Sequence, residues 1–298
     1  MKKLFPLYVW ALCIFMSCAQ VSGIVVFQSD FGLKDGAVSA MKGVAVGASK
    51  KVQLFDLTHE IPPYSIWDGA YRLYQTVEYW PKGTVFVSVV DPGVGSERAS
   101  VVAKLKNGQF IVTPDNGTLT LLADAFGIEE IRIIDEAVNR RQNSEASYTF
   151  HGRDVYAYTG ARLAGGVIKF ENVGPKVASG TCEMIPYQKP DFKDGKLSGT
   201  IPILDVQYGN VWTNITRAVA AHMRLEAGKE YAVTIYEGDA EKYSGRITYG
   251  NTFSDVPEGA CVMYYNSLDC LSFAINMDDF AATYGISYGG EWRVEIAE

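Results

Sequence analysis

Hydrophobic positions in the first half of the chain form short runs that alternate with helical patterns. Three runs are β-branched or aromatic, as buried strands are, and cover residues 24–27, 52–57 and 84–90. Between them, residues 37–46 and 67–80 carry apolar side chains at helical spacing. The alternation predicts an α/β N-terminal domain with a mostly parallel sheet flanked by helices. We place this domain at residues 24–187.

The pattern changes after about Pro186, where a polar stretch with proline and glycine precedes a series of short apolar runs. These runs are separated by turns and read as strands at 199–206, 230–236, 245–247, 261–265, 270–275 and 292–296. Short strands at this spacing predict a small all-β barrel or sandwich, of which we expect the barrel. We place this C-terminal domain at residues 196–298.

The chain opens with a segment unlike the rest. A basic start at Met1–Lys3 is followed by an uncharged apolar run, Leu4–Met16, which is too short to span a membrane but suits a signal peptide. Ser17 and Cys18 resemble a lipoprotein cleavage site, and ordinary cleavage near residues 19–23 is the alternative. We expect a signal peptide at residues 1–23 and an exported protein, periplasmic or anchored to the membrane by a lipid on Cys18. A cytoplasmic protein with an accidental apolar start is the last-ranked alternative.

Charge and composition exclude several functions. The 298-residue chain carries a net charge of −7 and has no cluster of basic residues, which argues against nucleic acid as a partner. It has three histidines and no zinc-ligand spacing, so we expect no metal and no cofactor. Beyond the leader only Cys182, Cys261 and Cys270 remain, and the sequence leaves open whether the last two form a disulfide.

The clearest candidate for chemistry lies at the end of the third predicted strand. Asp91 is followed by Pro92-Gly93-Val94-Gly95, a turn that stops the strand, and Arg98 comes close behind. In α/β sheets, ligands bind at the carboxyl ends of the strands, and an acid at the end of this buried strand has that position. The alternative is a turn-capping aspartate with a surface partner.

Other polar residues also follow predicted strands. Asp30 and Asp35 come after the first strand, where pocket residues and helix N-caps are both expected, and His59 comes after the second. His151 lies in the segment FHGRD before a predicted helix. In the second half, aromatic and amide side chains near Asp205 and Asn266 suit a flat heterocycle, and they equally suit ordinary turns.

Seven motifs occur in the order found in one enzyme family. They are SDFGLKDGAVSAMKG, DLTHEIPPYSIWDGAYRL, TVFVSVVDPGVGSER, IVTPDNGTL, TFHGRDVYA, DVQYGNVWTNI and YYNSLDCLSFAIN. From Ile24 to Glu298 the chain resembles the S-adenosylmethionine (SAM) hydroxide adenosyltransferases, relatives of the SAM-dependent fluorinase and chlorinase. The resemblance implies an α/β domain, a β-barrel domain and a homotrimer with active sites shared between subunits.

The resemblance also implies roles for individual residues. The family's hydrolytic set matches Asp91, Arg98 and His151, whereas halogenating relatives have tyrosine at the position of Asp91 and replace His151. The residues that match the family's substrate contacts are Asp30, Asp35, Tyr64, Asp205, Asn210, Trp212, Phe253, Ser267 and Met277.

The implied reaction is hydrolysis of SAM to adenosine and L-methionine. Attack at C5′ of a sulfonium expels a neutral thioether, so the reaction needs an oriented, activated water and no acid at the leaving group. Two alternatives stand beside it: an exported lipoprotein that binds SAM or adenosine without catalysis, and a SAM-dependent halogenase, which the acid at Asp91 disfavours.

Overall fold

The computed structural model describes residues 21–298, which form two compact units. The first unit comprises residues 21–64, 77–115 and 122–181, and the second comprises residues 65–76, 116–121 and 182–298. No helix of the described chain is long and apolar enough to cross a membrane. Nearly all of the expected signal peptide, Cys18 included, lies outside the described residues.

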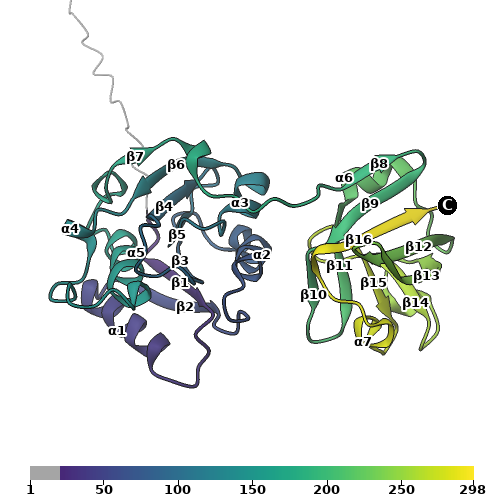
Figure 1. The fold of residues 1–298 in the computed structure, drawn as a ribbon, viewed down its shortest axis with the longest axis horizontal. Coiled ribbons are helices and arrows are strands. Elements are labelled where there is room, and N and C mark those ends of the chain that lie inside the picture. Colours follow the sequence, from purple (N-terminus) through teal and green to yellow (C-terminus); the bar gives the residue numbers. More distant parts are fainter. Residues whose placement is uncertain (1–20) are drawn as a thin grey trace, which may run out of the picture. The chain divides into compact units, whose positions relative to one another are not determined.

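The runs at 24–27, 52–57 and 84–90 are strands, and the patterns at 37–46 and 67–80 contain helices, as predicted (Figure 1). The α-helices are α1 (Ala37–Ala48), α2 (Ile66–Thr76), α3 (Thr120–Ala125), α4 (Glu136–Asn139), α5 (Tyr158–Ala164), α6 (Arg217–Ala220) and α7 (Phe280–Tyr284). The first unit's strands are β1 (Ile24–Ser29), β2 (Gln53–Thr58), β3 (Val85–Val89), β4 (Ser100–Leu105), β5 (Phe110–Pro114), β6 (Ile128–Ile133) and β7 (Lys176–Val177). Those of the second are β8 (Asp191–Lys193), β9 (Lys196–Ile201), β10 (Ile203–Asp205), β11 (Asn210–Thr216), β12 (Glu230–Glu237), β13 (Ala240–Tyr249), β14 (Cys261–Tyr265), β15 (Cys270–Ile275) and β16 (Gly289–Ala297).

The sheet of the first unit is mixed, with the strand order β2-β1-β3-β5-β4-β6-β7. β1 pairs in parallel with β2 and β3, and β3 pairs in parallel with β5. The remaining pairs, β5–β4, β4–β6 and β6–β7, are antiparallel. The expected mostly parallel sheet is therefore correct only for one half. The tight turn after Leu105 reverses the chain between β4 and β5 and makes them antiparallel neighbours.

This topology gathers many strand ends at one edge of the sheet. The carboxyl ends of β1, β2, β3, β5 and β6 meet the amino end of β4 there, as the pairing of Ser100 with Pro114 and of Val101 with Ile133 shows. The chain from β3 to β4 passes β5, which lies between them in the sheet. Asp91 and Ser100 therefore flank the end of β5 at this edge.

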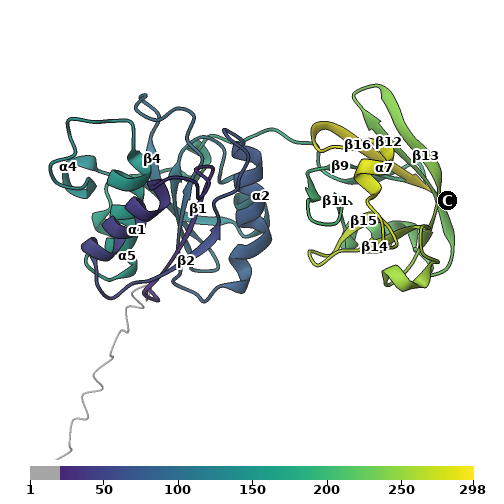
Figure 2. The same ribbon diagram turned by 90° about the horizontal axis from the view of Figure 1, so that it is seen from below.

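Helices α1 and α5 lie side by side against the sheet (Figures 1 and 2). Their apolar faces join those of β1, β3 and β5 in one core that includes Phe27, Met41 and Val87. Gly160 allows α5 to approach closely, because a Cβ at this position would lie 2.6 Å from Val87 Cγ2. The packing fixes the segment before α5, which carries His151.

The second unit is built on a nine-stranded sheet with the order β10-β11-β15-β14-β13-β12-β16-β9-β8. Within residues 182–298 no ladder joins the edge strands β10 and β8, so this sheet is open and the expected closed barrel is not confirmed. β9 nevertheless comes close to β11, where Thr200 N donates to Asn214 Oδ1 over 2.8 Å. Pro202 divides the strand expected at 199–206 into β9 and β10, because proline has no N–H to donate.

The three described cysteines, Cys182, Cys261 and Cys270, form no disulfide with one another. Cys261 lies opposite Ile275, and Cys270 lies opposite Thr216, so they are not cross-strand neighbours. The disulfide that the sequence left open does not form.

Candidate active site

Asp91 lies at the carboxyl end of β3 and is held by two side chains from neighbouring elements. Arg98, just before β4, donates from Nη2 to Asp91 Oδ2 over 2.6 Å. The hydroxyl of Tyr156 lies 3.2 Å from the same carboxylate oxygen. Tyr156 in turn accepts from Arg98 Nη1 over 3.1 Å and from Ser100 Oγ over 3.0 Å. Because these two donors occupy the phenol's acceptor capacity, its own proton points to Asp91.

The carboxylate of Asp91 is buried, with 5% of its side chain exposed. Burial raises the pKa of Asp91 above its usual value, against the opposing effects of Arg98, Tyr156 and His151. Its other oxygen, Oδ1, is buried and has no hydrogen-bond partner, and the same is true of Arg98 Nε. Buried polar atoms are usually paired, so these two mark a position where a ligand or water is expected.

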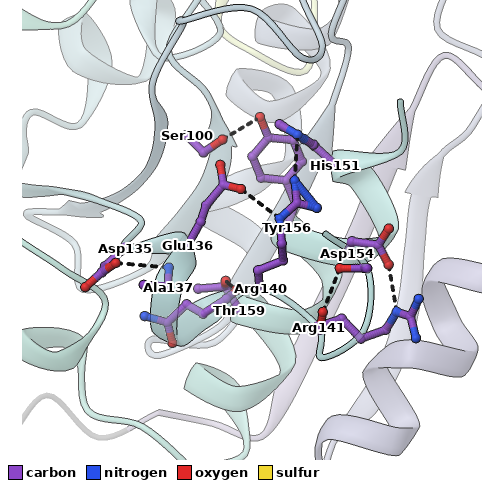
Figure 3. A network of polar contacts seen from close by, with 12 residues as sticks. Ser100, Asp135, Glu136, Ala137, Arg140, Arg141, His151, Asp154, Tyr156 and Thr159 are labelled. Atoms are coloured by element: carbon purple, nitrogen blue, oxygen red, sulfur yellow. Dashed lines mark hydrogen bonds and ion pairs between the residues drawn. The ribbon is translucent and has the colours of Figure 1, made fainter. Parts of the chain in front are cut away.

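His151 lies directly before the π-helical turn η2 (Gly152–Ala157) and is buried. Its Nε2 is 3.0 Å from Arg140 Nη2, and its Nδ1 is buried without a partner (Figure 3). Burial lowers the pKa of His151, Glu136 opposes this effect, and Arg140 adds to it. Asp91 and Arg98 also act on this pKa, which places His151 within electrostatic reach of both.

The π-helical turn brings His151 and Tyr156 to the same site. In a π-helix the hydrogen bond joins residues five apart, so these two residues, five apart in sequence, lie one turn from each other. Their rings are 6.4 Å apart between centroids. Asp154, fully buried on this turn, accepts from Arg141 Nε and from both Nε and Nη2 of Arg153. The hydrogen bond from Arg141 connects the turn to the segment after α4 (Figure 3).

A second polar chain lies at the same sheet edge. Ser29 Oγ is 2.7 Å from His59 Nδ1, and His59 Nε2 is 3.1 Å from Asp56 Oδ1. The residue types are those of a nucleophilic triad, but Ser29 and the His59 side chain are buried, with 0% and 1% exposed. A nucleophile without access to substrate does not react, so we interpret this chain as structural.

The structure places the predicted binding residues Asp30 and Tyr64 together. Tyr64 N donates to Asp30 Oδ2 over 2.9 Å, and the Tyr64 side chain is 73% exposed. Tyr64 has a φ of 68°, a left-handed backbone conformation that is uncommon for a bulky residue. Asp35 lies before Gly36, the N-cap residue of α1, and accepts from Ala37 N over 2.8 Å, so it contacts the first helical N–H without being the N-cap itself.

The other predicted binding residues belong to the second unit, where they line one pocket of about 710 Å³. The six are Asp205, Asn210, Trp212, Phe253, Ser267 and Met277. Asn210 donates to Asp205 Oδ2 over 3.1 Å, and the Phe253 ring packs on Tyr264 with centroids 4.8 Å apart. A volume of this size accommodates a small organic molecule, and the mixture of aromatic and amide groups suits a flat polar heterocycle.

Sequence reasoning missed three residues of the Asp91 site: Ser100, Arg140 and Tyr156. The sequence contained one indication that Tyr156 belongs to the site: it follows His151 by five residues within the same short motif. Arg140 follows β6 at the same sheet edge, but that strand was not predicted. Within residues 21–298 no group of three or more His, Cys, Asp or Glu side chains is arranged to hold a metal ion.

Several proteins with assigned names are similar to the chain. A (R)-S-adenosyl-L-methionine hydrolase of Methanocaldococcus jannaschii is 44% identical over 144 residues, or 47% of this chain and 52% of that protein. One of the same name from Thermus thermophilus is 33% identical, over 89% of this chain and 96% of that protein. A fluorinase of Actinopolyspora mzabensis is 28% identical over 94% of this chain and 99% of that protein.

Structural similarity extends over both units. The crystal structure of an uncharacterized conserved protein from Thermotoga maritima matches with a TM-score of 0.83 and 32% identity, covering 92% of this chain and all of that one. Residues 25–174 match the SAM hydroxide adenosyltransferase N-terminal domain, and residues 199–293 match the C-terminal domain of the same family. The chain belongs to the SAM hydroxide adenosyltransferase family.

Proposed function

We propose that this protein hydrolyses SAM to adenosine and L-methionine, with Asp91, Arg98 and His151 as its catalytic residues. One observation supports the proposal most strongly. Each of the three residues has a buried polar atom without a partner, namely Asp91 Oδ1, Arg98 Nε and His151 Nδ1. A site with unpaired acceptor and donor atoms is suited to hold a water molecule and remove its proton.

In the proposed reaction the water oxygen attacks C5′ of the adenosyl group, in line with the C5′–S bond. The new C5′–O bond forms as the C5′–S bond breaks, and the electron pair goes to sulfur. Methionine leaves as a neutral thioether, so no residue needs to donate a proton to it. The water's proton goes to Asp91 Oδ1, whose raised pKa brings it closer to the value of an effective base.

Arg98 and Tyr156 orient the base in this reaction. Both bind Asp91 Oδ2, and this leaves Oδ1 as the oxygen that faces the water. A positioned base contributes about 10²- to 10⁴-fold to a rate. The guanidinium also stabilises the negative charge that develops on the attacking oxygen.

The remaining predicted contacts divide between ribose and the other parts of the substrate. We assign Asp30 and Asp35 to the ribose hydroxyls and Tyr64 to stacking, as the family resemblance implies. We assign the pocket of the second unit to adenine and the methionine end. Its aromatic faces and the Asp205–Asn210 pair support this assignment.

The proposal includes assembly and location. We propose a homotrimer with active sites shared between subunits, a C-terminal domain that closes into a barrel, and export with a lipid on Cys18. Analytical ultracentrifugation tests the trimer. Mass spectrometry of protein from the producing cells tests the lipid, because an acylated Cys18 gives an N-terminal peptide of higher mass. A chain with residues 1–23 still present would overturn the proposal of export.

A halogenase is the second candidate, because fluorinases match nearly the whole chain. A halide would have to approach Asp91, whose buried carboxylate forms an ion pair with Arg98, and an ionised carboxylate repels an anion in a buried site. The first candidate, hydrolysis, uses the same carboxylate as its base.

The decisive experiment supplies SAM in water enriched in oxygen-18 and analyses products by chromatography and mass spectrometry. Because relatives carry the name (R)-S-adenosyl-L-methionine hydrolase, both sulfonium diastereomers are supplied separately. We expect adenosine that carries the label at its 5′ oxygen, methionine without it, and no effect of added chloride. Asp91→Asn should lose at least about 10²-fold in rate, whereas Asp194→Asn, in the exposed turn before β9, should not. Binding without any product would instead support the non-catalytic lipoprotein.

A further inference from the structure

Arg140 contacts His151, and Glu136 contacts Arg140. Neither the motifs nor the family resemblance indicated a role for these two residues. Glu136 and Arg140 belong to α4 and the residue after it, at the end of β6. Arg140 Nη2 is 3.0 Å from His151 Nε2, and Arg140 Nε donates to Glu136 Oε2 over 2.9 Å (Figure 3). The Arg140 side chain is 5% exposed, and its guanidinium lies 4.6 Å from the centre of the Tyr148 ring.

The chemistry of arginine determines which nitrogen of His151 carries the proton. A guanidinium only donates hydrogen bonds and stays charged, so the nitrogen facing it must accept. Nε2 is therefore unprotonated, and the proton of the neutral ring lies on Nδ1. Nδ1 is the ring atom that is buried without a partner.

We propose that Arg140, held by Glu136, is a positioning residue that fixes His151 as the neutral Nδ1–H tautomer and thereby makes it a hydrogen-bond donor in the site. The inference rests on the proposed function in one respect: the group that receives this hydrogen bond is the attacking water. It also assigns the proton acceptor. His151 has no free lone pair for a proton, so Asp91 Oδ1 accepts it.

Charged and aromatic groups face His151 from several elements. Glu136 and Arg140 come from the α4 segment, Asp91 from the end of β3, and Arg98 from the start of β4. Tyr148 and Tyr156 place their rings 6.1 Å and 6.4 Å from the imidazole. The two acidic groups raise the pKa of His151 and the two arginines lower it.

The test uses nitrogen-15 NMR of the histidine rings, which is practical because the chain has three histidines. His151→Gln assigns its signals. In the wild type at neutral pH we expect a protonated Nδ1 and an unprotonated, hydrogen-bonded Nε2. A ring protonated at Nε2 would overturn the proposal, whether or not the protein hydrolyses SAM, so this readout is independent of the proposed function.

Two variants should move the titration of His151 in opposite directions. Arg140→Gln removes a positive charge and should raise the midpoint, whereas Glu136→Gln removes a negative charge and should lower it. Arg140→Leu also removes the hydrogen bond, so the ring should populate both tautomers and kcat should fall about 10- to 100-fold, the range for losing a hydrogen bond to a charged group, with little change in KM.

Arg162→Gln is the matched control. It tests whether weakening the attachment of α4 is enough to change the titration of His151. Arg162 Nη1 bonds Val138 O and Asn139 Oδ1, so it anchors α4 without touching His151. Removal of the Arg162 guanidinium should lower the thermal stability of the protein and leave the midpoint of the His151 titration unchanged. Equal shifts in the Arg162 and Arg140 variants would mean that Arg140 acts only as a structural anchor, and would contradict the proposal.

Discussion

The hydroxyl of Tyr156 donates to Asp91 Oδ2 over 3.2 Å, while two other donors fix the orientation of that hydroxyl. A hydrogen bond to the ionised form of a carboxyl lowers its pKa. Tyr156 therefore limits the rise in pKa that burial imposes on Asp91. It also leaves Oδ1 as the only carboxylate oxygen without a partner.

Tyr156→Phe should shift the acid limb of the pH–rate profile to higher pH, because the ionised carboxylate loses a donor. We expect kcat to fall about 10-fold or more, as for other hydrogen bonds to charged groups, with KM nearly unchanged. Steady-state kinetics across pH check this. Tyr158→Phe, two residues along, is the control and should match the wild type. A Tyr156→Phe profile that keeps its midpoint would contradict the role.

The wild-type pH profile should show an acid limb and no loss of activity between about pH 7 and 8. Asp91 must be ionised, and its pKa is raised from 3.8, while His151 must be neutral, and its pKa is lowered from 6.5. The ion pair with Arg98 favours the ionised form of Asp91, the lowered pKa of His151 favours its neutral form, and lowering the pH protonates both groups. Measurement of kcat/KM from pH 4 to 9 decides this, and a rate that increases toward acid pH would exclude Asp91 as the base.

Asp205→Ala should weaken substrate binding and leave the chemical step intact. Asp205 is in the pocket of the second unit and accepts from Asn210, so its removal leaves that amide without a partner. We expect KM to rise about 10-fold, as for a lost hydrogen bond in a binding site, and kcat to change far less. Val206→Ala, at the neighbouring exposed residue, is the control. A loss confined to kcat would show that the pocket residue acts in catalysis.

Two glycine variants should shift thermal stability in opposite directions. A methyl group at Gly160 would meet Val87 Cγ2 at 2.6 Å, so Gly160→Ala should destabilise by about 1–3 kcal/mol through overpacking. A methyl group at Gly43, inside α1, meets nothing within 4 Å. Gly43→Ala should stabilise by up to about 1 kcal/mol through helix propensity. Calorimetry of both proteins provides the measurement, and a Gly160→Ala protein as stable as the wild type would refute the close packing.

The inner strands β1 and β3 were predictable because their side chains are buried on both faces, whereas β2, at the sheet edge, is only partly buried. β3 is fully buried, and four of its five residues are apolar, with Ser88 as the exception. β6 was missed for the opposite reason: it includes Glu129, Glu130 and Arg132, whose charges interrupt the apolar pattern. Since β6 leads to Arg140, missing the strand also meant missing the residue behind His151.

In the second unit, local sequence predicted most strands but not their arrangement. β11 was not predicted, because its polar residues Asn210, Thr213 and Asn214 interrupt the apolar pattern. Strand order depends on contacts between residues far apart in the chain, and periodicity does not encode these contacts. The same limit applies to Tyr156, because a π-helical turn differs from an α-helix by hydrogen-bond register and not by composition.

Because of the π-helical turn, the active site depends on the number of residues between His151 and Tyr156 as well as on their identity. A π turn contains one residue more than an α turn, so such a segment is equivalent to an α-helix that has gained an insertion. Deleting one residue between His151 and Tyr156 would restore a regular helix and rotate the following residues by about 100° around its axis. Sequence drift in this segment can therefore proceed by substitution, whereas a change in length would separate the histidine from the tyrosine in a single step.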